Sequence, residues 1–144
     1  MDSIVTLGIS LGLGLLIGLQ RERTESRLGG IRTFPLVSMF GTFCGMVSET
    51  KGGWPIAAGI LAIFGILAVA NWLNASSDAG EHGQTTDVAA LLTFAVGAYL
   101  PIGERTVAIV ATGLAVVLLH LKEPMHVFVR KMGPKDMAGI MQFV

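Results

Sequence analysis

Charge is scarce in this chain of 144 residues, and cysteine is almost absent. Charged residues make up 14% of the sequence, whereas an ordinary soluble domain has roughly 25%. Ten basic residues balance ten acidic ones, and this zero net charge argues against a nucleic-acid partner, which needs a basic surface. The single cysteine, Cys44, excludes an internal disulfide framework and a cysteine-based zinc finger. These absences leave a very apolar soluble domain or a membrane protein.

Long runs without any charge decide between the two. A bilayer span needs about 20 mostly apolar residues. The uncharged runs cover residues 3–20, 33–48, 52–77, 88–103 and 106–121. We therefore predict an all-α, polytopic membrane protein with about five transmembrane helices and the lipid bilayer as its main partner. The first run is not a signal peptide, because it lacks a basic start and ends in Gln20-Arg21-Glu22-Arg23 rather than at a cleavage site.

Basic residues predict the orientation in the membrane. An N-terminus outside and a C-terminus in the cytoplasm place eight Lys and Arg inside and leave Lys51 and Arg105 outside. This bias agrees with the positive-inside rule. The eight inner residues are Arg21, Arg23, Arg27, Arg32, Lys122, Arg130, Lys131 and Lys135.

Glycines four residues apart predict where helices pack. Such pairs let backbones approach closely in lipid, where packing rather than hydrophobicity drives association. We predict helix contacts at Gly8 and Gly12, at Gly14 and Gly18, and at Gly41 and Gly45. The alternative is the general tolerance of glycine in membrane helices. Because five short spans make a thin bundle, we also predict a homodimer.

The pattern changes after the last uncharged run. We predict a transmembrane domain over residues 1–122 and an amphipathic cytoplasmic or interfacial segment over residues 123–144. Met125, Phe128, Val129 and Met132 have helical spacing with basic residues between them, which is typical of a helix lying on the membrane surface. The same apolar spacing resumes after Gly133-Pro134 and continues to the last residue, as expected either of an interfacial tail or of the start of a further membrane domain.

One acid lies where a membrane protein tolerates few. If the fourth span starts near His82, then Asp87 lies about 7 Å inside the boundary, at a depth that suggests a cation path or an ion pair. If Thr85 or Thr86 caps the helix instead, Asp87 lies in the first turn, where a negative charge suits the helix dipole. The sequence leaves both alternatives open.

Two further polar residues extend this hypothesis. The amide of Asn71 offers a hard oxygen ligand for Mg²⁺, although such amides often only hydrogen-bond a neighbouring helix. Glu22 closes the first span on the same side as Asp87, so we predict a divalent-cation site from Asp87 and Glu22, with Asn71 and Thr86 beside them. No nucleophile–base arrangement or phosphate-binding loop occurs, so we expect no enzyme and no cofactor beyond a divalent cation as substrate.

Short motifs in the chain resemble a known family. The stretch Gly14-Leu-Leu-Ile-Gly18-Leu-Gln-Arg21-Glu22-Arg23, followed by Gly30-Ile-Arg32-Thr33-Phe34, resembles the N-terminal signature of the MgtC/SapB membrane proteins. The stretch Thr85-Thr86-Asp87-Val-Ala-Ala-Leu-Leu-Thr-Phe94 is similar to the stretch that opens a later span in that group. Leu121-Lys-Glu-Pro-Met-His126 and Met141-Gln-Phe143 resemble the subgroup in which this domain precedes a second membrane domain of unknown function.

The resemblance implies a bacterial or archaeal inner-membrane protein linked to divalent-cation homeostasis, chiefly of magnesium, and a dimer. It implies functional weight at Arg21, Glu22, Arg32, Thr33, Thr86 and Asp87, with Arg21, Arg32 and Thr33 in structural or ion-pair roles. The family includes proteins described as Mg²⁺ transporters and others regarded as regulators of membrane energetics. Two functions are therefore expected: cation transport, or a regulatory or scaffolding module that acts through helix contacts. Gln20 stands where the family often has Glu, and the cytoplasmic C-terminal domain of the MgtC proteins proper is absent from this sequence.

Overall fold

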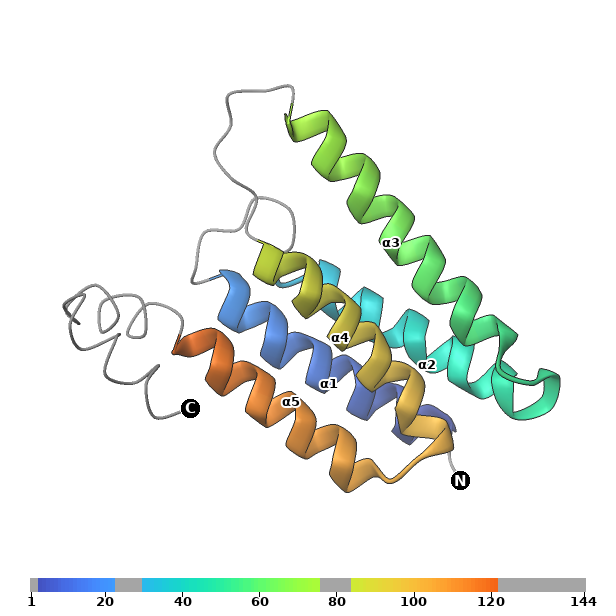
Figure 1. Ribbon diagram of the computed structural model, residues 1–144. Helices are drawn as coiled ribbons and strands as arrows, with labels where there is room; N and C mark the ends of the chain where they lie inside the picture. The colour runs from blue at the N-terminus through green and yellow to red at the C-terminus, as the bar shows by residue number, and fades with distance from the viewer. Residues whose placement is uncertain (1–2, 23–29, 76–83, 122–144) are drawn as a thin grey trace, which may run out of the picture.

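The described part of the protein folds as a bundle of five α-helices, shown in Figure 1. This computed structural model describes residues 3–22, 30–75 and 84–121. The predicted segment at residues 123–144 lies outside them. The helices are α1 (Ser3–Glu22), α2 (Thr33–Lys51), α3 (Trp54–Ala75), α4 (Gln84–Ile102) and α5 (Arg105–His120).

Within the described residues the helices follow the uncharged runs to within a few residues, which confirms the predicted all-α fold with five helices for this part of the chain. Charge and glycine lie where the helices stop: α2 ends at Lys51, and Gly52 follows with a φ of 82°, a left-handed conformation that glycine adopts without strain. Three segments are long and apolar enough to cross a membrane, namely Ser3–Glu22, Trp54–Leu73 and Thr85–Ile102. The chain is therefore a multi-pass membrane protein by its apolar helices.

Helices α2 and α5 fall below that standard for different reasons. Helix α5 is apolar but has 16 residues, which is about 24 Å at 1.5 Å per residue and less than the roughly 30 Å hydrocarbon core. Helix α2 has 19 residues, and Glu49 and Lys51 occupy its last turn. That α2 and α5 also cross the membrane is therefore part of the proposal made below.

Helices α1, α2 and α4 form the tightly packed centre of the bundle, and glycine makes their close approach possible. A Cβ atom at Gly14 would lie 2.6 Å from the Cα of Pro35 on α2. Cβ atoms at Gly41 and Gly97 would collide with backbone carbonyl oxygens across the α2–α4 contact, those of Phe94 and Ser38 respectively. In lipid, such close approach allows extensive van der Waals contact between helices.

The predicted packing glycines divide into two groups. Gly14 and Gly18 on α1 face the α2 segment, at Pro35 and Ile31, and Gly41 and Gly45 on α2 face α4. A Cβ at Gly8 or Gly12 would instead meet no atom within 4 Å. This first pair of α1 does not pack within the described part of the protomer.

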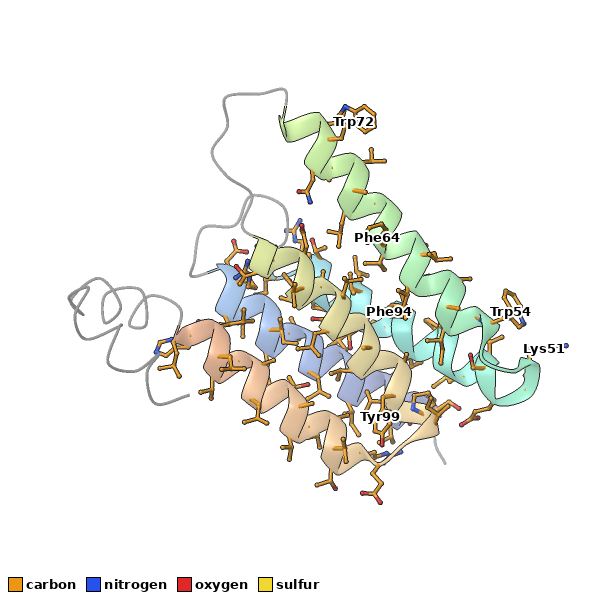
Figure 2. All side chains as sticks on the ribbon, in the orientation of Figure 1. Lys51, Trp54, Phe64, Trp72, Phe94 and Tyr99 are labelled. Carbon is orange, nitrogen blue, oxygen red and sulfur yellow. The ribbon has the colours of Figure 1, made fainter. Side chains whose placement is uncertain are left out.

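The apolar core lies between these central helices. Its largest fully buried apolar side chains are Phe34, Phe94, Ile17 and Leu100. The ring of Phe94 also contacts that of Phe40, with centroids 5.6 Å apart in a tilted arrangement. Figure 2 shows Phe94 inside the bundle, on the side of α4 that faces α2 and α3.

Helix α3 is the peripheral helix of the bundle. It approaches the other helices along one line, through the buried residues Pro55, Gly59 and Ile63. The rest of its surface is largely apolar and exposed, and only 6% of its spanning window is buried. Figure 1 shows that α3 meets α2 at its N-terminal end and leans away from α1 and α5 toward its C-terminal end.

Candidate functional site

Four polar side chains from three helices meet at one end of the bundle. They are Arg21 of α1, Asn71 of α3, and Thr86 and Asp87 of α4. We call this set the Arg21 cluster. The end of α1 meets the start of α4 here because the two helices run antiparallel, while α3 comes close enough for one side chain, Asn71, to reach across.

Arg21 is the most deeply buried member of the cluster. Its side chain is 3% exposed, and its Nη2 donates a hydrogen bond to Oγ1 of Thr86. The guanidinium also interacts electrostatically with the Asp87 carboxylate. Its Nε is buried and has no hydrogen-bond partner. A buried guanidinium needs both compensating charge and hydrogen bonds, and here the hydrogen bonding is incomplete.

Asn71 holds the Asp87 carboxylate from the opposite side. Its Nδ2 donates a hydrogen bond of 2.7 Å to Oδ2 of Asp87, and both side chains are half-buried. The amide oxygen Oδ1 of Asn71 is buried and unpaired. The two buried atoms without partners in the Arg21 cluster are therefore a donor, Nε of Arg21, and an acceptor, Oδ1 of Asn71.

The start of α4 determines where Asp87 lies along that helix. Helix α4 begins at Gln84, so Thr85 and Thr86 lie within its first turn rather than at the N-cap. Asp87 also belongs to the first turn, where its negative charge interacts favourably with the helix dipole. The structure thus places Asp87 at the beginning of the helix, next to the Thr86 hydroxyl that Arg21 contacts and close enough to the guanidinium for electrostatic attraction.

Glu22 makes its contact elsewhere. Its Oε2 accepts a hydrogen bond of 3.1 Å from the backbone N–H of Ile31, and the side chain is exposed. A Cβ at Gly30 would meet the same oxygen, so any larger residue there would shift the Glu22 carboxylate. Glu22 therefore closes the connection between α1 and α2, and its pairing with Asp87 in one metal site stays a prediction.

Arg32 and Thr33, the other residues carried over from the family motif, mark the start of α2. Arg32 occupies the N-cap position without a side-chain capping hydrogen bond, and its side chain is exposed. The backbone N–H of Thr33 donates to the carbonyl oxygen of Gly30 at 3.1 Å. The motif from Gly30 to Thr33 thus forms the turn that α2 follows.

A second buried polar cluster lies deeper in the bundle, and sequence reasoning missed it. Ser10 and Ser38 join α1 to α2 through hydroxyl oxygens 2.8 Å apart. Oγ1 of Thr42 lies 2.8 Å from Oγ of Ser10 and 3.0 Å from the carbonyl oxygen of Gly97 on α4. All three side chains are fully buried. The sequence did contain a signal, because Ser38 and Thr42 lie one turn apart beside Gly41.

A weaker pair of polar contacts fastens α5 to α1. Near the start of α5, Nη2 of Arg105 donates to Oγ1 of Thr6 at 3.3 Å, while Nε of Arg105 is buried and unpaired. At the other end, the amide nitrogen of Gln20 lies 3.5 Å from Nδ1 of His120. Arg105 of α5 thus lies near the start of α1, and Arg21 lies near its end. The predicted topology assigns these two ends to opposite sides of the membrane.

The Arg21 cluster sets limits on the metal it suits. Among the described residues, no three His, Cys, Asp or Glu side chains gather into one group. A soft-metal site of the zinc type therefore has no basis in this part of the chain. One carboxylate with amide and hydroxyl oxygens fits Mg²⁺ better, since this ion keeps several waters and takes one or two carboxylates from the protein.

Comparison with known proteins identifies the family. The MgtC family matches the chain over residues 7–128, which includes all five helices except the first residues of α1. No curated protein and no solved structure gives a match. The matched region covers most of the chain and contains the whole Arg21 cluster, so the protein belongs to the MgtC family.

Proposed function

We propose that this protein is an inner-membrane protein of divalent-cation transport or homeostasis, of the Mg²⁺ type, with its cation site at Asp87. The MgtC family is linked to Mg²⁺ homeostasis. In this proposal all five helices cross the membrane, and the Arg21 cluster faces the cytoplasm. The positive-inside bias of the sequence supports that orientation.

The tryptophans of α3 support this position in the membrane. Trp54 and Trp72 are 65% and 81% exposed, and Figure 2 shows them at opposite ends of α3. They are 18 residues apart, or five full turns, which gives about 27 Å at 1.5 Å per residue. Tryptophan favours the two membrane interfaces, and the hydrocarbon core is about 30 Å thick. Asn71, next to Trp72, thus brings Asp87 to the level of one interface.

The hydrogen bond between Asn71 and Asp87 is the observation that carries the proposal. It holds a carboxylate beside a buried amide oxygen, Oδ1 of Asn71, which has no partner of its own. Thr86 adds a hydroxyl oxygen next to Asp87 in the chain. Hard oxygen ligands with room for retained water are what Mg²⁺ takes, and an interfacial position lets a hydrated ion arrive from solution.

Replacement of Asp87 by Asn tests the proposal. We expect the purified full chain to bind Mn²⁺, used as a spectroscopic substitute for Mg²⁺, and Asp87→Asn to lose that binding at least tenfold because one carboxylate carries the site's negative charge. Electron paramagnetic resonance of free Mn²⁺ measures the binding, and Mg²⁺ flux in proteoliposomes measures transport. The matched control is Glu49→Gln, an exposed acid in the last turn of α2.

Three outcomes distinguish the alternatives. Loss of both binding and flux in Asp87→Asn, with Glu49→Gln unchanged, supports transport through this site. If wild type binds Mn²⁺ but carries no Mg²⁺ flux, and Asp87→Asn loses the binding, the result supports homeostasis by sensing rather than by transport. Equal Mn²⁺ binding by wild type and Asp87→Asn would overturn the assignment of Asp87.

The open glycines of α1 favour a second candidate function, a non-transporting regulatory or scaffolding module. Gly8 and Gly12 face no protein atom within 4 Å, and the exposed side chains around them include Ile4, Val5 and Leu11. Small residues of this kind suit a helix from another protein or from a second copy, as in the predicted homodimer. This function requires no metal binding, so the Mn²⁺ measurement separates it from the first.

A further inference from the structure

A cation already lies beside Asp87: the guanidinium of Arg21. It is held by the hydrogen bond to Thr86 and by electrostatic attraction to the Asp87 carboxylate. Arg21 therefore contacts one of the three groups that the proposed site offers to a metal ion, Thr86, and is electrostatically attracted to a second, Asp87. A divalent cation and this guanidinium are alternatives for the same carboxylate.

The charges favour competition over joint occupation. One positive charge on Arg21 and one negative charge on Asp87 leave the pair neutral, and a neutral site attracts a divalent ion weakly. If the guanidinium moves away from Asp87, the carboxylate presents a net negative charge. Binding of the metal and displacement of Arg21 are thus coupled by electrostatics.

The unpaired atoms of the Arg21 cluster indicate that another arrangement of these side chains could satisfy more of their hydrogen-bonding groups. Nε of Arg21 and Oδ1 of Asn71 are both buried without partners, and burying a polar group without a hydrogen bond is unfavourable. A metal ion at Asp87 would use Oδ1 as a ligand. Because Arg21 lies in the last turn of α1, at the proposed membrane surface, a displaced guanidinium would reach water and hydrate its Nε there.

We propose that Arg21 is a tethered cation that occupies Asp87 when the metal is absent and that a divalent ion must displace. This inference rests on the proposed function, because it concerns the same site. On this proposal Arg21 lowers the affinity of the site and so sets the concentration of divalent cation at which the protein binds it. Its charge, rather than its hydrogen-bonding shape, produces the effect.

Two substitutions of Arg21 separate charge from shape. We expect Arg21→Gln to bind Mn²⁺ about tenfold more tightly than wild type, within the range of about 5- to 150-fold typical of coupled binding. Arg21→Lys keeps the charge and loses the planar fork, so its affinity should stay within about threefold of wild type. Both are measured by electron paramagnetic resonance on the purified full chain, with thermal unfolding as the control for folding.

The outcomes distinguish this inference from the proposed function. If Asp87→Asn loses Mn²⁺ binding but Arg21→Gln binds Mn²⁺ no more tightly than wild type, the tethered cation is overturned and the proposed site at Asp87 remains. If Arg21→Lys binds Mn²⁺ as tightly as Arg21→Gln does, the positive charge of Arg21 is not what weakens binding. Unchanged Mn²⁺ binding in Asp87→Asn removes the proposed site and this inference together.

A measurement on the wild type holds even if Arg21→Gln fails to fold. Saturating Mg²⁺ should shift the ¹⁵Nε resonance of Arg21, assigned by its loss in Arg21→Lys, because the guanidinium exchanges Thr86 for water. Wild-type protein that binds Mg²⁺ while this resonance stays unmoved would contradict displacement.

Discussion

The bundle contains two buried polar clusters that differ in how completely they are paired. In the hydroxyl cluster of Ser10, Ser38 and Thr42, every hydroxyl has a partner, and the members come from helices that approach closely. In the Arg21 cluster, two buried atoms lack partners, and one member comes from the peripheral helix α3. Both clusters join three elements of the bundle, but the hydroxyl cluster is fully buried, whereas Asn71 and Asp87 of the Arg21 cluster are half-buried.

The difference separates a structural role from a functional one. Native proteins pair nearly all of their buried polar groups, so complete pairing needs no further explanation than stability. Unpaired buried atoms beside a carboxylate and a guanidinium indicate a site whose other arrangement is stabilised by something else, such as an ion. On this basis we assign the hydroxyl cluster a structural role and propose the Arg21 cluster as the binding site.

Gly97→Ala should have the largest effect, because it separates the helices on which the hydroxyl cluster depends. The new methyl group would occupy the space of the Ser38 carbonyl oxygen, and a backbone atom cannot move without its helix. We expect a loss of about 3 kcal/mol in the free energy of unfolding, as for severe overpacking. Unfolding in micelles measures it, with Gly113→Ala as the control, since a Cβ there meets no atom within 4 Å. Equal stability of the two variants would contradict the close α2–α4 contact.

Thr42→Val should have a moderate effect on stability and none on metal binding. The Thr42 hydroxyl has one proton to share among Ser10 Oγ, the Ser38 carbonyl and the Gly97 carbonyl, so its removal loses roughly one hydrogen bond. We expect a loss of about 1 kcal/mol, as for hydrogen bonds between membrane helices. The exposed Thr106→Val is the matched control. A change in Mn²⁺ affinity would show that the two clusters are not separate in function.

Glu22→Gln should have the smallest effect and marks the edge of the Arg21 cluster. The amide oxygen of Gln still accepts the Ile31 N–H, and the side chain is exposed, so stability should change by less than about 0.5 kcal/mol. Its Mn²⁺ affinity should stay within about twofold of wild type, because exposed charges are well screened by salt. A drop as large as that of Asp87→Asn would restore Glu22 as a ligand, as the sequence predicted.

The helices were predictable from the sequence because a membrane helix is defined locally. A run of apolar residues without charge satisfies its backbone internally, so the five uncharged runs correspond to α1–α5 within a few residues. The family motif also singled out Arg21, Thr86 and Asp87, and the structure brings Arg21 into contact with Thr86, the residue before Asp87. The crossing of α2 and α5 was less predictable, since Glu49 and Lys51 enter one helix and the other has 16 residues.

The partners within the site were harder to predict, because pairing depends on which faces of distant helices meet. The sequence placed Glu22 and Asp87 on one membrane side, but the hydrogen bond from Ile31 takes the Glu22 carboxylate into the α1–α2 connection. It assigned arginine to topology, although Arg21 is 3% exposed and contacts Thr86. No sequence motif singled out Ser10, Ser38 and Thr42, yet they join three helices.

The sequence by itself determined the all-helical membrane fold, the ends of its helices and the glycines that let some of them touch. These properties follow from hydrophobicity, charge and side-chain size, which act over one helix at a time. Only the tertiary structure decided that Asn71 reaches Asp87, that Arg21 lies buried beside it and that Glu22 contacts Ile31. Such contacts join residues as far apart as Arg21 and Thr86, 65 positions along the chain, and they exist only once the packed backbones fix which side chains face each other.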